Sequence, residues 1–311
     1  MAVGSITAAG VVSLVAGGDI TDANNDQTAN ITASRIRLEA GGSVGSAVDV
    51  ANTALDIESD AVEVQAGGDV HLRSQGTVTI GGVGPVVTSY ARFDSGTSTK
   101  IDADLSGLVA GGDLTLTSIH GDIRQTGGSD HVEVGGSSVL TALNGDIALE
   151  NPLNDFIGLV DATAQNVAVR DRNDLSVGRI FATGGGHVRL TAGEDIIGDC
   201  TQPNVIAGTA ELYAGQDIGN PLYLDVGRID EARAGRDINL VEVSDDMRIL
   251  RQVYAGRNVV LDVLDGGIYD ADGDGYVHYR NVTPSTADIY AGSEMRLIAD
   301  YVGTQTEPLE L

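Results

Sequence analysis

The segment that decides the fold reads Val-Arg-Leu-Thr-Ala-Gly-Glu-Asp-Ile, at residues 188–196. Its first four residues alternate between apolar and polar, as expected for a strand with one buried face. An Ala-Gly-x-Asp corner and a further apolar residue follow. The same corner returns at residues 16–20, 66–70, 110–114, 214–218 and 234–238, with degenerate copies near Ala40, Ala255 and Ala291.

The corners recur at a near-constant interval. In the second half of the chain the first glycine of each corner lies at positions 193, 215, 235 and 256, which gives spacings of 22, 20 and 21 residues. Earlier corners, at positions 17, 41 and 67, are 24 and 26 residues apart, and the 44 residues from position 67 to 111 are interpreted as two units of 22. The repeating unit is therefore about 21 residues.

Such a unit matches one coil of a β-solenoid. Short alternating runs between the corners predict two or three strands per unit, and no sustained spacing of three and four predicts a helix. Stacked units would pair each strand with its equivalent above and below and share one continuous core. A β-sandwich also has alternating strands, but its antiparallel strands give no reason to repeat one corner sequence. Dividing 311 residues by 21 gives about 15 coils.

Composition supports a β-rich fold and excludes one class of partner. The chain has 42 Gly, 6 Pro and no Trp, which fits many tight turns around a core of small aliphatic residues. Its 45 acidic and 18 basic residues give a net charge of −27, and Lys100 is the single lysine. A surface of this kind repels phosphate backbones, so nucleic acid is not an expected partner. No run of about 20 apolar residues predicts a membrane span.

Two further sequence motifs resemble those of a known family. One runs Asn-Asp-Phe-Ile-Gly-Leu-Val at residues 154–160 and continues as Val-Ala-Val-Arg-Asp-Arg-Asn-Asp-Leu-Ser-Val-Gly at residues 167–178. The other is a corner followed by Ile-Gly and Pro-Leu-x-Leu, at residues 214–224 and again near residues 301–311. With the Ala-Gly-x-Asp corners, these motifs resemble the repeat regions of filamentous haemagglutinins and related large exoproteins of the two-partner secretion type.

This resemblance implies a right-handed parallel β-helix in a large secreted or cell-surface bacterial adhesin. We expect residues 1–311 to form a single β-helix segment, cut from a longer chain, with an export signal outside it. The expected role is a structural or adhesive rod, and not an enzyme. Expected partners are a surface protein or glycan of a host or neighbouring cell, or further copies of the chain. A self-assembling extracellular filament subunit is one alternative, and a carbohydrate-active lyase or hydrolase, using Asp245 and Asp246 with His120 or His187, is another.

One segment has the pattern of a calcium loop. Asp270, Asp272 and Asp274 stand at positions 1, 3 and 5 of such a loop, and Tyr276 would add its carbonyl oxygen at position 7. Position 12 is Asn281 in place of the usual glutamate, which predicts weak binding. This loop lies in an insertion around residues 265–281, where the 36 residues between the corners at 256 and 292 exceed one unit by about 15. An Asp- and Gly-rich turn that binds no ion is the alternative.

The corner aspartates allow two interpretations. Each side chain would cap its own turn, which is the more common use of such an aspartate. Alternatively, Asp195, Asp217 and Asp237 would stack as a ladder of like charges, with Arg236 and Arg257 at the same corner to offset the repulsion. We favour the first interpretation from the sequence.

Overall fold

The protein is an all-β parallel solenoid. The computed structural model describes residues 1–311 except 48–49, 94–95, 200–202, 272–287, 305–306 and 309–311. About 2% of the chain is helical, and the strands form about 12 turns of roughly 22 residues. This confirms the predicted parallel β-helix, its repeat length and the near absence of helix. The chain divides into two compact units, Met1–Asp155 and Phe156–Leu311, and each is described by itself.

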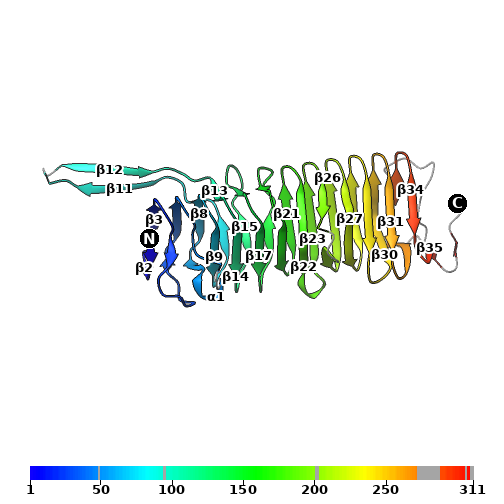
Figure 1. Cartoon of the computed structure of the whole chain (residues 1–311), viewed down its shortest axis with the longest axis horizontal. Coiled ribbons are helices and arrows are strands. Elements are labelled where there is room, and N and C mark those ends of the chain that lie inside the picture. Colours follow the sequence, from blue (N-terminus) through cyan, green and yellow to red (C-terminus); the bar gives the residue numbers. More distant parts are fainter. Residues whose placement is uncertain (48–49, 94–95, 200–202, 272–287, 305–306, 309–311) are drawn as a thin grey trace. The chain divides into compact units, whose positions relative to one another are not determined.

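Unit 1 stacks parallel strands into sheets that together form its coils (Figure 1). The first sheet contains β2 (Ile6–Thr7), β5 (Ile31–Thr32), β7 (Leu55–Glu58), β9 (Val70–Ser74), β14 (Leu114–Ser118) and β17 (Ser138–Ala142). The second contains β3 (Val11–Ala16), β6 (Arg35–Ala40), β8 (Ala61–Ala66), β13 (Gly107–Ala110) and β16 (His131–Val134), together with β10 (Val78–Ile80), β15 (Ile123–Gln125) and β18 (Ile147–Leu149). Outside them lie β1 (Ala2–Val3), paired with β4 (Thr21–Asp22), the short helix α1 (Val50–Thr53), and the hairpin of β11 (Val86–Ala91) and β12 (Thr97–Asp102).

Unit 2 repeats this arrangement, and its longest strands have nine residues. Its first sheet contains β20 (Val160–Ala164), β22 (Leu175–Ala182), β24 (Ile196–Gly198), β25 (Val205–Ala207), β27 (Ile218–Val226), β29 (Ile238–Glu242), β31 (Val259–Val263) and β34 (Met295–Ile298). Its second contains β21 (Val167–Asp171), β23 (His187–Ala192), β26 (Thr209–Ala214), β28 (Ile229–Ala234), β30 (Met247–Ala255), β32 (Gly267–Asp270), β33 (Ile289–Ala291), β35 (Tyr301–Thr304) and β36 (Glu307–Pro308). A 3-10 turn, η1 (Thr183–Gly185), follows β22, and β19 (Asp155–Phe156) lies where the chain passes from unit 1 to unit 2.

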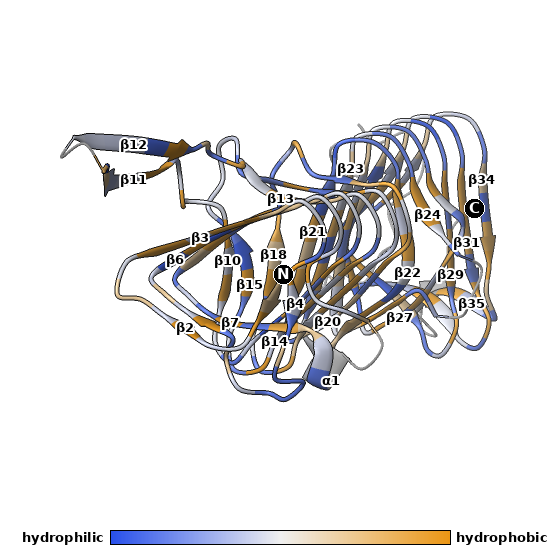
Figure 2. Cartoon of the chain, turned by 60° about the vertical axis from the view of Figure 1, so that its left-hand side comes forward, coloured by the Kyte–Doolittle hydropathy of each residue, from blue (hydrophilic) through white to orange (hydrophobic). Residues whose placement is uncertain are grey.

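The core of each unit is a set of aliphatic columns, because a parallel register without offset places equivalent residues over one another. In unit 1 one column is Leu38, Val64, Leu108 and Val132, all fully buried. In unit 2 the equivalent column is Leu190, Leu212, Ala232, Val253 and Ile289. Figure 2 shows hydrophobic stretches on successive strands and largely hydrophilic turns. Each large aliphatic side chain buried in this way contributes about 1.5–3 kcal/mol.

The corner glycines stack directly on one another, which explains why the motif needs them. A Cβ on Gly67 would lie 2.5 Å from the carbonyl oxygen of Gly41, inside van der Waals contact. In unit 2 a Cβ on Gly215, Gly235 or Gly256 would overlap in the same way with the carbonyl oxygen of the corner glycine in the coil before it. The corners at 193, 215, 235 and 256 therefore lie over one another, as their near-constant spacing predicts.

The interpretation of the 44 residues between positions 67 and 111 as two units is wrong. Ala110 pairs with Ala66, and a Cβ on Gly111 would overlap with the carbonyl oxygen of Gly67, so the two corners belong to adjacent coils. The extra residues form the β11–β12 hairpin, which extends away from the stacked strands (Figure 1). Such insertions also explain why the chain has about 12 turns and not the predicted 15.

The corner stacking predicts different effects of one substitution at two equivalent positions. Gly67→Ala should lower the free energy of unfolding by about 1–3 kcal/mol, because the added methyl group forces adjacent backbones apart. Gly17 occupies the same corner position but has no atom within 4 Å of the Cβ site, so Gly17→Ala should change stability by less than about 0.5 kcal/mol. Urea unfolding of both variants measures this, and equal losses would contradict the stacking argument.

Candidate functional site

The predicted calcium loop falls mostly outside the described residues. Asp270 ends β32 and is partly exposed, whereas Asp272, Asp274 and Tyr276 lie in the segment 272–287. The corner Gly292 stacks directly on Gly256, so the coil between them holds 36 residues. Calcium binding by this loop, and the limits of the insertion around residues 265–281, stay predictions.

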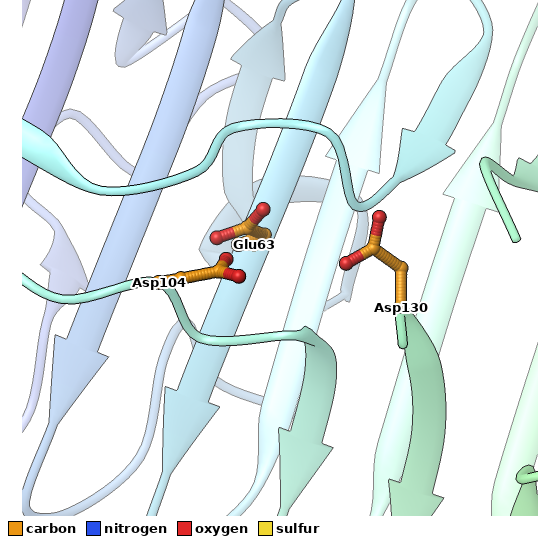
Figure 3. Close-up of side chains that lie close together, drawn as sticks. All are labelled: Glu63, Asp104 and Asp130. Atoms are coloured by element: carbon orange, nitrogen blue, oxygen red, sulfur yellow. The ribbon is translucent and has the colours of Figure 1, made fainter. Parts of the chain in front are cut away.

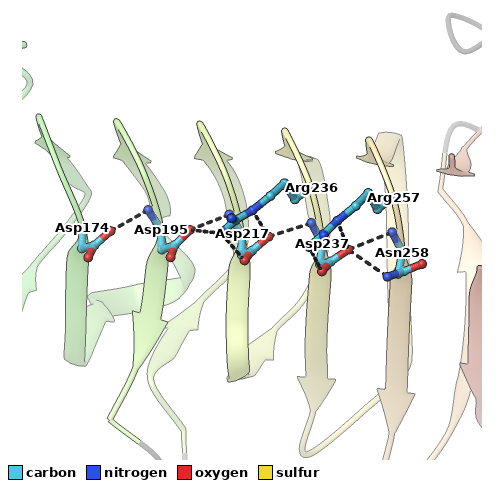
Figure 4. A network of polar contacts seen from close by, with 7 residues as sticks. All are labelled: Asp174, Asp195, Asp217, Arg236, Asp237, Arg257 and Asn258. Carbon is cyan, nitrogen blue, oxygen red and sulfur yellow. Dashed lines mark hydrogen bonds and ion pairs between the residues drawn. The ribbon is translucent and has the colours of Figure 1, made fainter. Parts of the chain in front are cut away.

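The corner aspartates form a ladder that joins successive coils, and the favoured interpretation, that each caps its own turn, is wrong. In unit 2 the Oδ1 atom of each corner residue accepts a hydrogen bond from the backbone N–H of its counterpart one coil later (Figure 4). The donor to acceptor distances are 3.0 Å from Asp195 to Asp174, 2.8 Å from Asp217 to Asp195, 2.9 Å from Asp237 to Asp217 and 3.1 Å from Asn258 to Asp237. A corner N–H points along the coil axis toward the preceding coil, so the nearest acceptor belongs to that coil.

Two arginines offset the charge of this ladder. Arg236 donates to both carboxylate oxygens of Asp217, at 3.1 and 2.6 Å, and Arg257 donates to Asp237 (Figure 4). The hydrogen bond that Arg236 donates to Asp217, and the nearby charges of Asp217, Asp195 and Asp237, raise the pKa of the Arg236 guanidinium. Stacked carboxylates at coil spacing would otherwise repel one another. The ladder with intervening arginines, the less favoured interpretation, is the one that the structure supports.

Unit 1 contains the same ladder without arginines. The backbone N–H of Ser43 donates to Asp19 at 2.9 Å, that of Asp69 to the Ser43 hydroxyl at 3.0 Å, and that of Asp113 to Asp69 at 2.9 Å. Here a serine separates two of the carboxylates, which reduces their repulsion. The position therefore requires a short side chain with an oxygen acceptor, and charge is secondary.

Three carboxylates gather at the base of the β11–β12 hairpin (Figure 3). One oxygen of each of Glu63, Asp104 and Asp130 lies within 4.8 Å of the others. The Glu63 side chain projects from β8, is fully buried, and accepts hydrogen bonds from the N–H groups of Val83 at 2.7 Å, Gly84 at 3.1 Å and Leu105 at 3.2 Å. Val83 and Gly84 precede the hairpin and Leu105 follows it, so one carboxylate ties down both ends of the insertion.

This cluster has the oxygen donors that a hard cation prefers, but its oxygens already have protein partners. Asp130 accepts hydrogen bonds from the Gly82 N–H at 3.0 Å and from the Thr126 hydroxyl. Burial raises the pKa of the Glu63 carboxyl, the backbone N–H groups lower it, and the hydrogen bond with Asp104 raises it further. No pattern in the sequence indicated this cluster, because its three members come from three successive coils, Asp104 from the insertion in the middle one.

The residues of the enzymatic alternative, Asp245, Asp246, His120 and His187, do not share one environment. Asp246 Oδ1 accepts hydrogen bonds from the Gly267 N–H at 3.0 Å and the Tyr301 hydroxyl at 3.0 Å, whereas Asp245 is exposed. His120 belongs to unit 1, and His187 Nδ1 lies 2.7 Å from the Thr209 hydroxyl in unit 2. The paired carboxylates of this alternative therefore have different environments, with Asp246 fixed in the structure and Asp245 facing solvent.

The motif at residues 154–178 has a structural role in each unit. Phe156 is among the largest fully buried side chains, and its N–H donates to Asp171 at 2.7 Å. Asp171, which is 1% exposed, also accepts from the Asn173 N–H at 2.7 Å. In unit 1 the buried Asn154 accepts from the Val132 N–H at 2.9 Å and donates to the Leu149 carbonyl at 3.0 Å. These side chains satisfy backbone groups where strands end.

Comparison with known proteins supports the assignment of the chain as a repeat protein. Residues 95–163 match the model of a family described as repeats of unknown function, DUF5649. No curated protein and no solved structure matches the chain. In the described parts of the chain, no helix is long and apolar enough to cross a membrane.

The corner ladder predicts that Asp217 matters for stability through its oxygen more than through its charge. Asp217→Ala should lower the free energy of unfolding by about 1–2 kcal/mol, because the Asp237 N–H loses its acceptor and Arg236 loses its two shorter hydrogen bonds. Asp217→Asn keeps an acceptor for that N–H and should lose less than half as much. Urea unfolding compares the two variants, and a loss from Asn as large as that from Ala would contradict a hydrogen-bonding role.

The Glu63 clamp predicts a local effect on the hairpin. Glu63→Ala should speed hydrogen exchange at the amides of Val83, Gly84 and Leu105, because each loses its acceptor. Exchange at the corner amide of Asp113, which donates to Asp69 in the same unit, serves as the internal control and should stay unchanged. Equal protection of the three amides in both proteins would show that Glu63 does not hold the hairpin.

Proposed function

We propose that the chain is a structural and adhesive rod segment of a large secreted or cell-surface bacterial protein. The observation that supports this is the coil-to-coil bonding of both units. Corner glycines, corner aspartates and core columns all find their partners in adjacent coils, so each coil is completed by its neighbours. A structure of this kind can be extended coil by coil without a new type of contact. It suits a stiff spacer that carries insertions on its surface.

The hairpin of unit 1 supports the adhesive part of this role. Val87, Tyr90 and Ile101 are 60%, 54% and 65% exposed on a two-stranded ribbon that extends from the coils. Large apolar side chains at the surface favour contact with another molecule. The ribbon also leaves the corner and core contacts of the coil intact, so recognition and stability are separated. The proposed partners are a protein or glycan on another cell surface, with secretion as the proposed route.

A one-coil deletion tests the rod. Removal of residues 215–234 joins Ala214 to Gly235 and restores an Ala-Gly corner. We expect this variant to fold, and to be shorter by about 5 Å in small-angle X-ray scattering, because adjacent coils are one strand spacing apart. Removal of residues 215–224, about half a coil, is the control and should unfold the protein, since it deletes one corner and moves the strands that follow away from their partners in the preceding coil.

The same samples address the alternatives. Failure of the one-coil deletion to fold would argue against interchangeable coils and against a simple spacer. Concentration-dependent growth in light scattering would favour the filament subunit. Release of reducing ends from a polysaccharide would favour the carbohydrate-active enzyme.

A further inference from the structure

A groove of about 620 Å³ crosses successive coils at one corner of unit 2. Gly208, between β25 and β26, and Gly227, between β27 and β28, contribute one coil each. The next coil contributes Asp246 and Arg248, and β32 contributes Tyr269. Four coils at a strand spacing of about 4.8 Å give the groove a length of ~15 Å along the coil axis.

The floor of the groove is backbone. A Cβ on Gly227 would lie 2.8 Å from the carbonyl oxygen of Gly208, and one on Gly208 would overlap with the carbonyl oxygen of Gly185. Close stacking therefore requires glycine at this corner as it does at the Ala-Gly-x-Asp corner. Because these residues have no side chains, an extended ligand can approach the backbone closely.

Charged side chains stand in the groove as paired donors and acceptors. Arg228 Nε lies 2.6 Å from Asp230, and a guanidinium nitrogen of Arg248 lies 3.8 Å from Asp246. Hydrogen bonds from Gly267 and the Tyr301 hydroxyl hold the Asp246 carboxylate in place. A sugar hydroxyl both donates and accepts, so it can bond to a carboxylate and a guanidinium at once. Groups fixed before binding lose little entropy when the ligand arrives.

An aromatic ring completes the groove. Tyr269 lines it, and its ring packs against Tyr301 with the centroids 5.2 Å apart and the planes at 64°. This edge-to-face contact fixes the orientation of Tyr269. A tyrosine combines an apolar ring face with a hydroxyl, which suits a sugar ring that has apolar C–H groups and polar edges.

The charges favour an uncharged ligand. Among the described residues of the groove, both arginines have carboxylate partners, and Asp270 adds another carboxylate to its wall. The chain as a whole carries −27, which repels a polyanion at long range. The two guanidinium groups disfavour a metal cation. A neutral ligand rich in hydroxyl groups meets none of these penalties.

We propose that this groove binds a linear neutral polysaccharide, with its axis along the coils. The coil spacing is comparable to the length of one β-linked pyranose unit, so consecutive sugars meet consecutive coils. A glycan ligand makes the proposed adhesive role more specific. The proposal rests on that role, because it treats the glycan as bound and not cleaved.

Affinity electrophoresis tests the groove with the whole chain. Native gels are cast with dextran, xylan, β-glucan or galactomannan, and with polygalacturonate as the anionic comparison. We expect at least one neutral polysaccharide to retard the protein. Arg248→Ala and Tyr269→Ala should each raise the dissociation constant at least tenfold, and Tyr269→Phe should keep most of the affinity because it keeps the ring. The Arg248 side chain is 59% exposed, so its removal should leave the fold intact, as the thermal unfolding midpoint would show.

Arg170→Ala is the matched control, because Arg170 is an exposed arginine of β21 in the same unit that does not line the groove. It should bind as the unchanged protein does. No retardation in any neutral gel, or equal retardation of the Arg248→Ala and Tyr269→Ala variants and the unchanged protein, would overturn the proposal, as would retardation by polygalacturonate alone. If no neutral polysaccharide binds but the one-coil deletion variant folds, the groove proposal is rejected and the proposed rod function is retained. Release of reducing ends would keep the groove as a glycan site and reject the non-catalytic role.

Discussion

The close approach of one corner to the next is the constraint on which the rest of each unit depends. The carbonyl oxygen of a corner glycine occupies the position where a side chain of the following corner would begin. This brings the backbones of successive coils together at the point where the chain changes direction. Neighbouring strands are therefore in register next to each corner, and the apolar columns align there. A single Cβ at such a corner would disturb both sheets that meet there.

Hydrogen bonding between coils completes the corner. The N–H at the aspartate position points along the axis and has no partner in its own coil, so a short side chain of the preceding coil accepts it. Aspartate, asparagine and serine all meet this need. Where aspartates follow one another in unit 2, Arg236 and Arg257 reduce the repulsion. Much of the acidic composition at the corners therefore has a structural cause.

Insertions extend the surface without disturbing this framework. The strands on either side of the β11–β12 hairpin, β10 and β13, still pair with β8 of the preceding coil. The Glu63 carboxylate accepts hydrogen bonds from backbone groups at both ends of the hairpin. The groove of unit 2 is built differently, from the loss of side chains at a glycine corner and from polar residues on the flanking strands. Both features use positions that face outward, where a change has little effect on the apolar columns.

The sequence by itself determined the fold class, the repeat length and the corner at which coils meet, because these depend on alternation and spacing along the chain. It did not determine which coil supplies the partner of Asp217, since an aspartate can cap its own turn or the next with the same local sequence. Nor could spacing alone separate one long coil from two short ones between Gly67 and Gly111. The tertiary structure decided both, because the stacking of coils sets which backbone groups lie opposite each other. It also brought together Glu63, Asp104 and Asp130, and Asp246 with Tyr269 and Tyr301, which are separated in sequence and meet only when successive coils are stacked.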